Sequence, residues 1–388
     1  MMVNTPNIRF KGFTDDWEQR KFSDVVDIGS GMDYKHLGEG DIPVYGTGGY
    51  MLSVDAALSE DKDAIGIGRK GTIDKPYILR APFWTVDTLF YCIPKDGYDL
   101  DFTSCLFQNV DWKKKDESTG VPSLSKVIIN NVETTAPSYE EQRKIGDYFK
   151  GIDNLITLQQ RKCDETKELK KYMLQKMFPK NGERIPEIRF EGFTDDWEQR
   201  KLGDFGKATG GTSIESEFSE GGKYKVISIG SYSEDSIYRD QGIRAIESEK
   251  TKIRVLNKDD LTMILNDKTS SGNIIGRVLL IEESGVYVYN QRTERIEVDH
   301  DNYDSLFIYE MLNAPQIRDK IVKQSQGNTQ IYVNWSTIAE TGYLVPQIDE
   351  QRCLGEFFSN LDNLITLHQR KCDEIKELKK YMLQNMFV

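Results

Sequence analysis

The chain has 388 residues, of which 38% are hydrophobic and 29% charged, and it is long enough for two or three globular domains. The sequence contains no run of 18 apolar residues, and its N-terminus lacks an apolar secretory core. These absences exclude a membrane-spanning helix and predict a cytoplasmic protein. The formal net charge of −12 argues against a simple nucleic-acid-binding protein, although a global sum does not describe any single face.

Two pairs of near-identical blocks alternate along the chain with two divergent stretches. Residues 8–21 (IRFKGFTDDWEQRK) recur at 188–201 with one change. Residues 153–175 (DNLITLQQRKCDETKELKKYMLQ) recur at 362–384 with two changes. The stretches between these blocks show little resemblance to each other. Near-identical blocks on both sides of divergent stretches predict one scaffold that presents two different recognition surfaces.

This alternation predicts four segments: a first body over 1–139, a first helix over 140–180, a second body over 181–348 and a second helix over 349–388. Short β-branched or aromatic runs bounded by Gly, Pro, Asn or Asp predict strands in both bodies. These runs are Ala64–Gly68, Pro76–Leu79, Phe90–Ile93, Tyr224–Ile229 and Val286–Tyr289. Helical patterns over Tyr303–Leu312 and Gln316–Gln324 interrupt them, so each body is predicted to be a mixed α/β domain.

The long repeats predict two long helices. Their apolar residues recur at alternating steps of four and three, and no proline interrupts residues 140–178 or 349–388. A helix of about 38 residues is about 57 Å long. We expect the two copies to pair as an antiparallel coiled coil through Ile145, Phe149, Ile152, Ile156, Met173, Leu354, Phe358, Leu361, Ile365 and Met382. A helical hairpin with no role beyond packing is the alternative.

Motifs for catalysis or metal binding are missing from the sequence. Residues 66–71 match the GxGxxG pattern, but Pro76 follows too soon for the helix that a dinucleotide fold requires, so a turn between strands is predicted. The sequence has no phosphate-binding GxxxxGK[ST] loop and no helicase motif. The five cysteines form no CxxC pair, and the three histidines have no metal-ligand spacing to them. We therefore expect no catalytic residue, no metal site and reduced cysteines.

Glycine-rich loops in both bodies carry residue types suited to contacts with bases and phosphates. Arginine pairs favourably with guanine, and asparagine or glutamine with adenine, in the major groove of DNA. The candidate DNA-binding residues are Tyr45, Thr47, Arg69, Lys70, Thr212, Ser213, Asn273, Arg277, Arg292, Asn328 and Gln330. A solvated loop without function is the alternative for each of them.

The layout resembles the specificity subunit of type I restriction–modification systems over essentially the whole chain. Matching stretches are the openings DWEQRKFSDV and DWEQRKLGDF, the exits APSYEEQR and LVPQIDEQR, and the helix text KKYMLQ. The turn at 210–213 (GGTS) is similar to the family's GGT turn, whereas residues 29–32 (GSGM) depart from it. No single motif is highly specific, but the duplicated arrangement of body and helix is.

This resemblance implies two target-recognition domains on a helical spacer, with each domain reading half of a bipartite site in double-stranded DNA. It implies that two methyltransferase subunits and motor-nuclease subunits are the partners. S-adenosylmethionine, ATP and Mg are then expected on those partners and no cofactor on this chain. A coiled-coil adaptor that presents two protein-binding domains is the rival interpretation, and the acidic net charge favours it. The target sequence itself depends on loop geometry and cannot be read from the chain.

Overall fold

The computed structural model describes residues 5–116, 118–180, 182–268 and 271–388. Contacts divide the chain into a first unit, the residues up to Arg161 together with His368–Val388, and a second unit, Lys162–Leu367. Each unit thus combines one body with parts of both long helices. We call the residues of each unit that lie outside these helices the first body and the second body.

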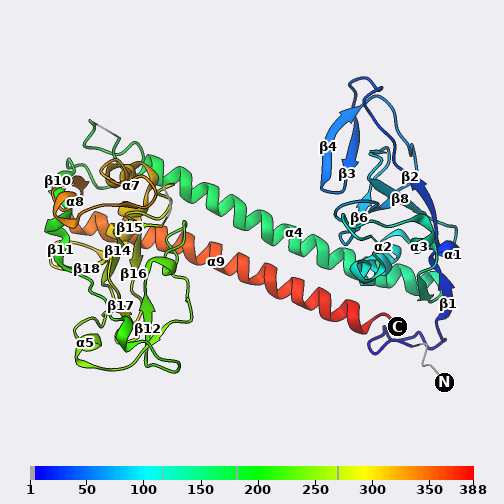
Figure 1. Cartoon of the computed structure of the whole chain (residues 1–388). Coiled ribbons are helices and arrows are strands. Elements are labelled where there is room, and N and C mark those ends of the chain that lie inside the picture. Colours follow the sequence, from blue (N-terminus) through cyan, green and yellow to red (C-terminus); the bar gives the residue numbers. More distant parts are fainter. Residues whose placement is uncertain (1–4, 117, 181, 269–270) are drawn as a thin grey trace. The chain divides into compact units, whose positions relative to one another are not determined.

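The two long helices are α4 (Tyr139–Lys176) and α9 (Ile348–Asn385), each 38 residues long. The prediction of two uninterrupted helices of this length is confirmed. In the first unit, His368 Nδ1 lies 2.8 Å from Gln159 Oε1, and Lys379 Nζ donates to Asp153 at 2.7 Å. Residue numbers rise along α9 as they fall along α4, so the helices run antiparallel where they lie side by side (Figure 1).

The same helix contacts recur in the second unit with the roles of α4 and α9 exchanged. Lys170 of α4 donates to Asp362 of α9 at 2.7 Å, as Lys379 does to Asp153. Each lysine also contacts the body of the unit to which it belongs. Lys170 lies 2.9 Å from Glu310 of the second body, and Lys379 donates to Gln108 of the first body at 2.7 Å. Because the paired positions are 209 residues apart, the repeated sequence blocks make equivalent contacts in both units.

The described residues of the first body form three sheets and short helices. The four-stranded sheet has the order β2 (Val26–Ser30), β8 (Leu89–Pro94), β5 (Ala64–Gly68) and β6 (Tyr77–Leu79). The three-stranded sheet has the order β4 (Gly49–Val54), β3 (Ile42–Gly46) and β7 (Trp84–Thr85), and β1 (Glu18–Lys21) pairs with β9 (Glu133–Ala136). The helices are α1 (Phe22–Val25), α2 (Leu100–Asn109), α3 (Lys126–Asn130) and the 3₁₀ helix η1 (Trp112–Lys115). Figure 1 shows the β3–β4 hairpin as a layer apart from β2 and β8.

The second body repeats this plan. Its four-stranded sheet has the order β11 (Gly206–Gly210), β18 (Thr293–Val298), β14 (Leu261–Ile264) and β16 (Val278–Leu280). A second sheet has the order β13 (Arg244–Ala245), β12 (Tyr224–Ile227) and β17 (Tyr287–Tyr289). Two further strand pairs are β10 (Glu198–Lys201) with β20 (Gly342–Val345) and β15 (Asn266–Asp267) with β19 (Ile331–Tyr332). The helices are α5 (Glu249–Lys252), α6 (Ser305–Asn313), α7 (Pro315–Val322) and α8 (Trp335–Ile338), with 3₁₀ helices η2 (Leu202–Phe205), η3 (Glu215–Glu217) and η4 (Ile229–Ser231).

The two bodies therefore share their sheet topology although their sequences diverge. In both, a central pair of antiparallel strands (β8 with β5, β18 with β14) is flanked by equivalent outer strands, and the smaller sheet contains one parallel pairing. The mixed α/β prediction is confirmed. A strand lies in each of the five predicted segments, although β12 ends at Ile227 and the 3₁₀ helix η4 begins at Ile229. The first half of the GxGxxG segment belongs to β5, which ends at Gly68. Its second half, residues 69–71, lies between β5 and β6 with no helix following, as predicted.

The short repeat joins each body to the beginning of a long helix. Arg9 forms a bidentate pair with Glu141 at 2.7 and 2.8 Å, and Arg189 pairs with Glu350 at 2.7 Å through both nitrogens. Both glutamates are about 1% exposed, so each carboxylate depends on its arginine for compensation. The identical arginine–glutamate joint explains why these two sequence blocks resemble each other so closely.

After the C-terminal end of each long helix, a phenylalanine packs into the core of one body. Phe387, after α9, contacts Trp17 at 5.9 Å between ring centroids, and Phe178, after α4, contacts Trp197 at the same distance. All four rings are buried. Each body is therefore completed by the helix that begins at the other body in the sequence.

The predicted helix-pairing residues divide between these cores and the contact between the helices. Ile145, Phe149 and Ile152 are buried in the core of the first body, against which Ile156 and Met382 also pack. In the second body, Leu354, Phe358 and Leu361 take the buried places and Met173 packs against them. Ile365 is half-buried, and its carbonyl lies 3.8 Å from Cys163 Sγ on the facing helix.

Candidate nucleic-acid interface

In each body, the turn between two strands gathers three other segments around it through hydrogen bonds. In the first body this is the turn between β7 and β8. Gly31 N donates to Leu89 O at 3.0 Å, Val86 N to Tyr45 O at 3.0 Å, and Arg69 N to Thr88 O at 2.8 Å. We call residues 30–32, 45–50, 69–71 and 85–88 the first rim.

The second body has an equivalent arrangement at the turn between β17 and β18. Gly211 N donates to Thr293 O at 2.8 Å, Asn290 N to Ile227 O at 3.0 Å, and Leu265 N to Arg292 O at 2.9 Å. We call residues 210–213, 227–228, 265–266 and 290–293 the second rim. The two rims have the same backbone connections and different side chains.

The first rim brings together the four candidate residues of the first body. Tyr45 is half-buried on β3, and its ring packs against Tyr50 and Tyr77 at 6.4 and 6.2 Å between centroids. Thr47 lies in the β3–β4 turn. Arg69 and Lys70 are exposed just after β5, with the Arg69 guanidinium 5.8 Å from the centre of the Phe90 ring. An aromatic cluster and two exposed cations therefore share one rim.

The second rim contains three of the seven candidates of the second body. Thr212 and Ser213 are exposed in the segment that follows β11. Arg292 is exposed in the turn between β17 and β18, where its φ of +67° is unusual for a residue other than glycine. Arg69 N donates to Thr88 O in the first body, and Leu265 N donates to Arg292 O in the second. Arg69 is therefore the donor, and Arg292 the acceptor, of the same backbone hydrogen bond in the two bodies.

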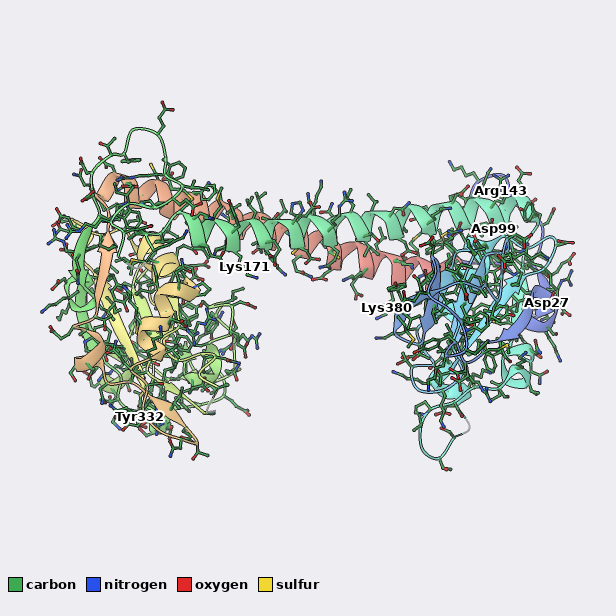
Figure 2. The ribbon with its side chains drawn as sticks, turned by 90° about the horizontal axis from the view of Figure 1, so that it is seen from above. Asp27, Asp99, Arg143, Lys171, Tyr332 and Lys380 are labelled. Carbon is green, nitrogen blue, oxygen red and sulfur yellow. The ribbon has the colours of Figure 1, made fainter. Side chains whose placement is uncertain are left out.

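A hairpin next to the second rim carries Asn328 and Gln330, both of them exposed. Gln326 and Tyr332 exchange backbone hydrogen bonds of 2.9 Å that close this hairpin. Its strand β19 pairs with β15, which begins at Asn266 of the rim. Tyr332 lies at the end of the second unit remote from the long helices (Figure 2). The structure thus places these two amides beside the rim.

Asn273 and Arg277 are more constrained than the other candidates. Asn273 Nδ2 donates to Glu234 at 2.9 Å, and Arg277 donates to Asn273 O and Ser236 Oγ at 3.3 Å. Arg277 is half-buried, and burial lowers its pKa. These contacts tie the segment that precedes β16 to the loop around Ser236, so both side chains already have internal partners.

Arg254 is an important neighbour of the second rim that sequence reasoning missed. It is 8% exposed and donates to three groups, two of which belong to the rim segment 210–213. In the sequence, Arg254 stands among the apolar residues of Ile253–Leu256, and this pattern indicates that its side chain is buried. Its partners, however, lie more than 30 residues away in sequence, so the sequence alone did not reveal them.

The acidic charge of the chain lies outside the long helices. α4 carries nine basic and seven acidic residues, and α9 carries six and seven, so the helices together contribute +1. The remaining residues therefore contribute −13 to the total of −12. Exposed cations such as Lys171 and Lys380 project from the helices (Figure 2). Any attraction of the bodies for phosphate must come from local clusters, since their overall charge repels it.

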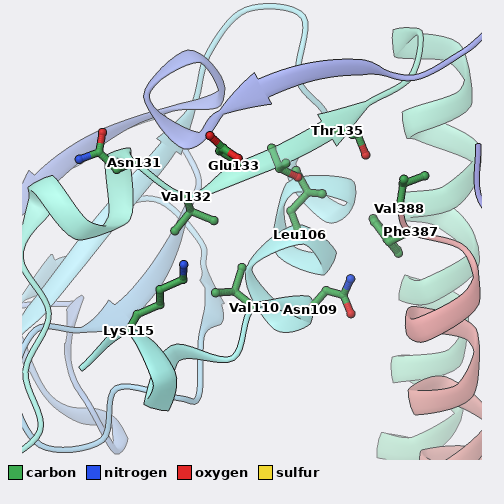
Figure 3. Close-up of a pocket in the computed structure, with 11 residues that line it drawn as sticks. Leu106, Asn109, Val110, Lys115, Asn131, Val132, Glu133, Thr135, Phe387 and Val388 are labelled. Atoms are coloured by element: carbon green, nitrogen blue, oxygen red, sulfur yellow. The ribbon is translucent and has the colours of Figure 1, made fainter. Parts of the chain in front are cut away.

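A pocket of about 360 Å³ in the first unit lies apart from the candidate residues (Figure 3). Apolar side chains such as Leu106 and Phe387 and polar ones such as Lys115, Asn131 and Glu133 line it, between α2, β9 and the end of α9. A pocket of the second unit occupies the equivalent place beside Phe178 and β20. Both pockets belong to the joints between body and helix.

Within the described ranges, no group of three or more His, Cys, Asp or Glu side chains is arranged to hold a metal ion. No disulfide forms among the described residues, and Cys163 and Cys372 are buried in the helix contacts, 3.8 Å from Ile365 O and 3.9 Å from Ile156 O. Of the helices in the described part of the chain, none combines the length and apolar character needed to cross a membrane.

Comparison with known proteins identifies the family. The type I restriction modification DNA specificity domain matches residues 14–168 and 194–377, one copy over each repeat of body and helix. The chain belongs to this family. Each copy of the specificity domain covers one rim and most of the long helix that follows it.

Relatives share this organisation at low sequence identity. The type I restriction enzyme MjaVIII specificity subunit of Methanocaldococcus jannaschii is 25% identical over 278 residues, which are 70% of this chain and 65% of that protein. The crystal structure of the type I restriction–modification system S subunit from M. genitalium has a TM-score of 0.71 at 15% identity, with 99% of both chains covered. A chain from a structure described as the basis of complex assembly and conformational transition of the type I R-M system has a TM-score of 0.53 at 13% identity, covering 95% of this chain and 96% of that one. The structures show that the fold of the specificity domain is shared.

Proposed function

We propose that this chain is the DNA-recognition subunit of a type I restriction–modification complex, in which each body reads one half of a bipartite DNA target. The observation that carries this proposal is the pair of rims. Their backbone hydrogen bonds are equivalent, whereas the side chains that they present differ. One scaffold with two different displays suits the reading of two different half-sites, because direct readout depends on which side chains face the base edges.

In this proposal the chain directs chemistry that its partners perform. Two methyltransferase subunits methylate adenine with S-adenosylmethionine, and motor-nuclease subunits cleave DNA with ATP and Mg. The chain itself supplies no catalytic group and binds no cofactor. The name of the relative from M. jannaschii, a specificity subunit of a restriction enzyme, supports this division of labour.

An adaptor that presents two protein-binding bodies is the rival function, and the charge of −13 outside the long helices favours it. The DNA-reading proposal answers this objection if the complex, rather than this chain alone, neutralises most of the phosphates. A gel shift of the chain with its methyltransferase partner on mixed duplexes separates the two functions. Binding of the complex to DNA without sequence preference, with methylation at random adenines, would favour the adaptor.

Exchange of one body tests modular reading. Residues 202–347 are replaced by the second body of another family member, and the methylated motif is mapped by sequencing DNA from cells that also express the methyltransferase partner. We expect one half of the motif to change and the other half to persist, because each rim is built within a single body. Simultaneous change of both halves, or an unaltered motif, would contradict the proposal.

A further inference from the structure

Arg254 lies beneath the second rim and holds it through hydrogen bonds. Its Nη1 donates to Gly210 O at 2.6 Å and to the Tyr289 hydroxyl at 3.0 Å, and its Nη2 donates to Thr212 Oγ1 at 3.0 Å. Its guanidinium also lies 5.2 Å from the centre of the Tyr289 ring. At 8% exposure, Arg254 is covered by the protein, so it faces the rim from within.

The contacts of Arg254 use the shape of its side chain. A planar guanidinium can donate in several fixed directions while one face rests on an aromatic ring. A lysine ammonium at the same place is a point charge on a flexible stem and does not reproduce that fork. The carbonyl of Gly210 and the hydroxyl of Thr212 are therefore held at a fixed spacing, which determines the path of residues 210–213.

Close packing beneath the turn adds to this constraint. Glu294, which is 5% exposed, lies so near that a Cβ on Gly210 would approach its Oε2 to 3.2 Å. A Cβ on Gly211 would clash with the carbonyl of Asn290. The two glycines thus allow the turn to lie against the strands below it, and Arg254 holds it there.

The first body fastens its equivalent turn by different means. There the indole Nε1 of Trp84, 5% exposed on β7, donates to Met32 O at 2.9 Å. Met32 lies in the segment after β2, as Thr212 lies in the segment after β11. Each rim is therefore held by its own buried side chain, one neutral and one cationic, and the two can be altered separately.

We propose that Arg254 is a positioning residue for sequence discrimination by the second body. It sets the conformation of residues 210–213 so that Thr212 and Ser213 meet the base edges, and it does not touch the DNA itself. This inference rests on the proposed function and adds to it the residue on which half of the specificity depends. Trp84 has the corresponding role for the first body and supplies the matched control.

The test compares Arg254→Met, Arg254→Lys and Thr212→Val with Trp84→Phe, each co-expressed with the methyltransferase partner. Methylated motifs are read by sequencing, and each half-site is scored separately. We expect Arg254→Met to lower discrimination at one or more second-half positions by about tenfold, within the range of a lost bidentate contact, with the first half unchanged. Trp84→Phe should produce the reverse pattern.

A purely structural role predicts a different result. Loss of folding lowers methylation at every site and leaves the motif itself intact, and that outcome for Arg254→Met, Arg254→Lys and Thr212→Val together would overturn the inference. Arg254→Lys keeps most of the packing, so it decides the matter if Arg254→Met does not fold, whereas Thr212→Val also removes a proposed base contact and shows how a lost second-half contact reads out. We expect both to relax the second half of the motif.

Salt dependence distinguishes positioning from direct contact. Removal of a cation that contacts phosphate reduces the slope of log affinity against log salt by about one. We expect Arg254→Met to leave this slope unchanged in the complex with the methyltransferase partner, and a reduced slope would show that Arg254 binds DNA. If the wild-type chain directs no bipartite motif at all, the proposed function fails, which is distinct from failure of the role of Arg254.

Discussion

Arg69 and Arg292 are the exposed cations that flank the same backbone junction in the two rims. We expect Arg69→Ala to weaken recognition of the first half-site and Arg292→Ala that of the second. An arginine that contacts guanine contributes about 1–3 kcal/mol of discrimination, whereas one that contacts phosphate weakens all sequences alike. Competition binding of the complex against duplexes with single-base changes measures which of these applies.

Lys171→Ala is a suitable control for these two variants. Lys171 is also exposed, but it lies on α4 outside both rims, with its Nζ 3.9 Å from Glu168 on the same helix. We expect it to leave the preferred sequence as it is. Arg69→Ala with wild-type affinity and motif would remove Arg69 from the interface.

Glu294 makes the stability of the protein depend on pH. Burial raises the pKa of its carboxyl to about 7, although nearby Arg254 opposes the shift. Between pH 4.5 and 7 the folded protein therefore retains a proton that the unfolded chain has lost. It follows that Glu294 destabilises the fold progressively as pH rises through this window and has a constant effect above it.

Urea unfolding of the full chain and of Glu294→Gln at pH 5, 6, 7 and 8 checks this expectation. The free energy of unfolding of the glutamine variant, relative to wild type, should increase from pH 5 to 7 and then level off. Other raised carboxyls such as Glu310 contribute equally to both proteins, so the difference isolates Glu294. Parallel pH profiles would mean that Glu294 is ionised in the folded state at pH 5.

At the scale of elements, the sequence predicted regular structure well and the relation between the bodies poorly. The apolar periodicity of the long repeats predicted α4 and α9 because a stripe of spacing three and four specifies a helix without reference to other residues. The strand segments, such as Ala64–Gly68, were also readable from β-branched residues between glycines. Both kinds of signal are local.

The shared sheet order and the rims could not be predicted in the same way. β5 (AIGIG) and β14 (LTMI) occupy equivalent places in their sheets but have no residue pattern in common. Their equivalence depends on pairing with β8 and β18, whose partner residues lie 21–27 and 29–35 positions away in the sequence. The fastening of residues 210–213 by Arg254, and of Met32 by Trp84, likewise joins residues whose distance in sequence exceeds any local pattern.

The repeated helices expose the same apolar trio in each unit. Leu155, Leu378 and Tyr381 belong to the first unit, and their equivalents Leu364, Leu169 and Tyr172 belong to the second. All six side chains are 44–55% exposed. Apolar side chains repeated identically on an open helix surface suit two copies of one partner, which in our proposal are the two methyltransferase subunits.

Charge substitutions in this trio should separate the two docking events. We expect Leu378→Asp or Leu169→Asp to reduce the complex from two methyltransferase subunits to one, and the double variant to bind none, because each aspartate would be desolvated in one interface. Mass measurement of the purified complex reports the stoichiometry. Lys380→Ala, also exposed on α9, is the control. Full occupancy of the double variant would place the docking surface elsewhere.

At the scale of the whole molecule, duplication accounts for the way in which, under the proposed function, one chain reads two sequences. The parts that repeat almost without change are those with the same contacts in both units, namely the arginine–glutamate joints and the helix contacts of Lys170 and Lys379. The parts that diverge are the rims, which carry different side chains on one backbone plan. Selection for a new target can then alter a rim without disturbing assembly, because the two functions lie on different residues.

Under the proposed function, we expect helix length to set the spacing between the two half-sites. Both readers must meet one duplex, so a change in the helices that connect them should change the number of unread base pairs. Four added residues lengthen a helix by about 6 Å, and each base pair adds about 3.4 Å along DNA.

Insertion of four residues after Arg161 and after Leu367 lies at the boundary of the two units and leaves the helix contacts within each unit intact. We expect the methylated motif of this double insertion to keep both half-sites and to gain one or two base pairs between them. Insertion in one helix alone is the control and should abolish activity, because it shifts the antiparallel contacts out of register. If the double-insertion variant methylates DNA with the original spacing, α4 and α9 do not determine the gap, and the interpretation of these helices as a hairpin that only packs would be favoured.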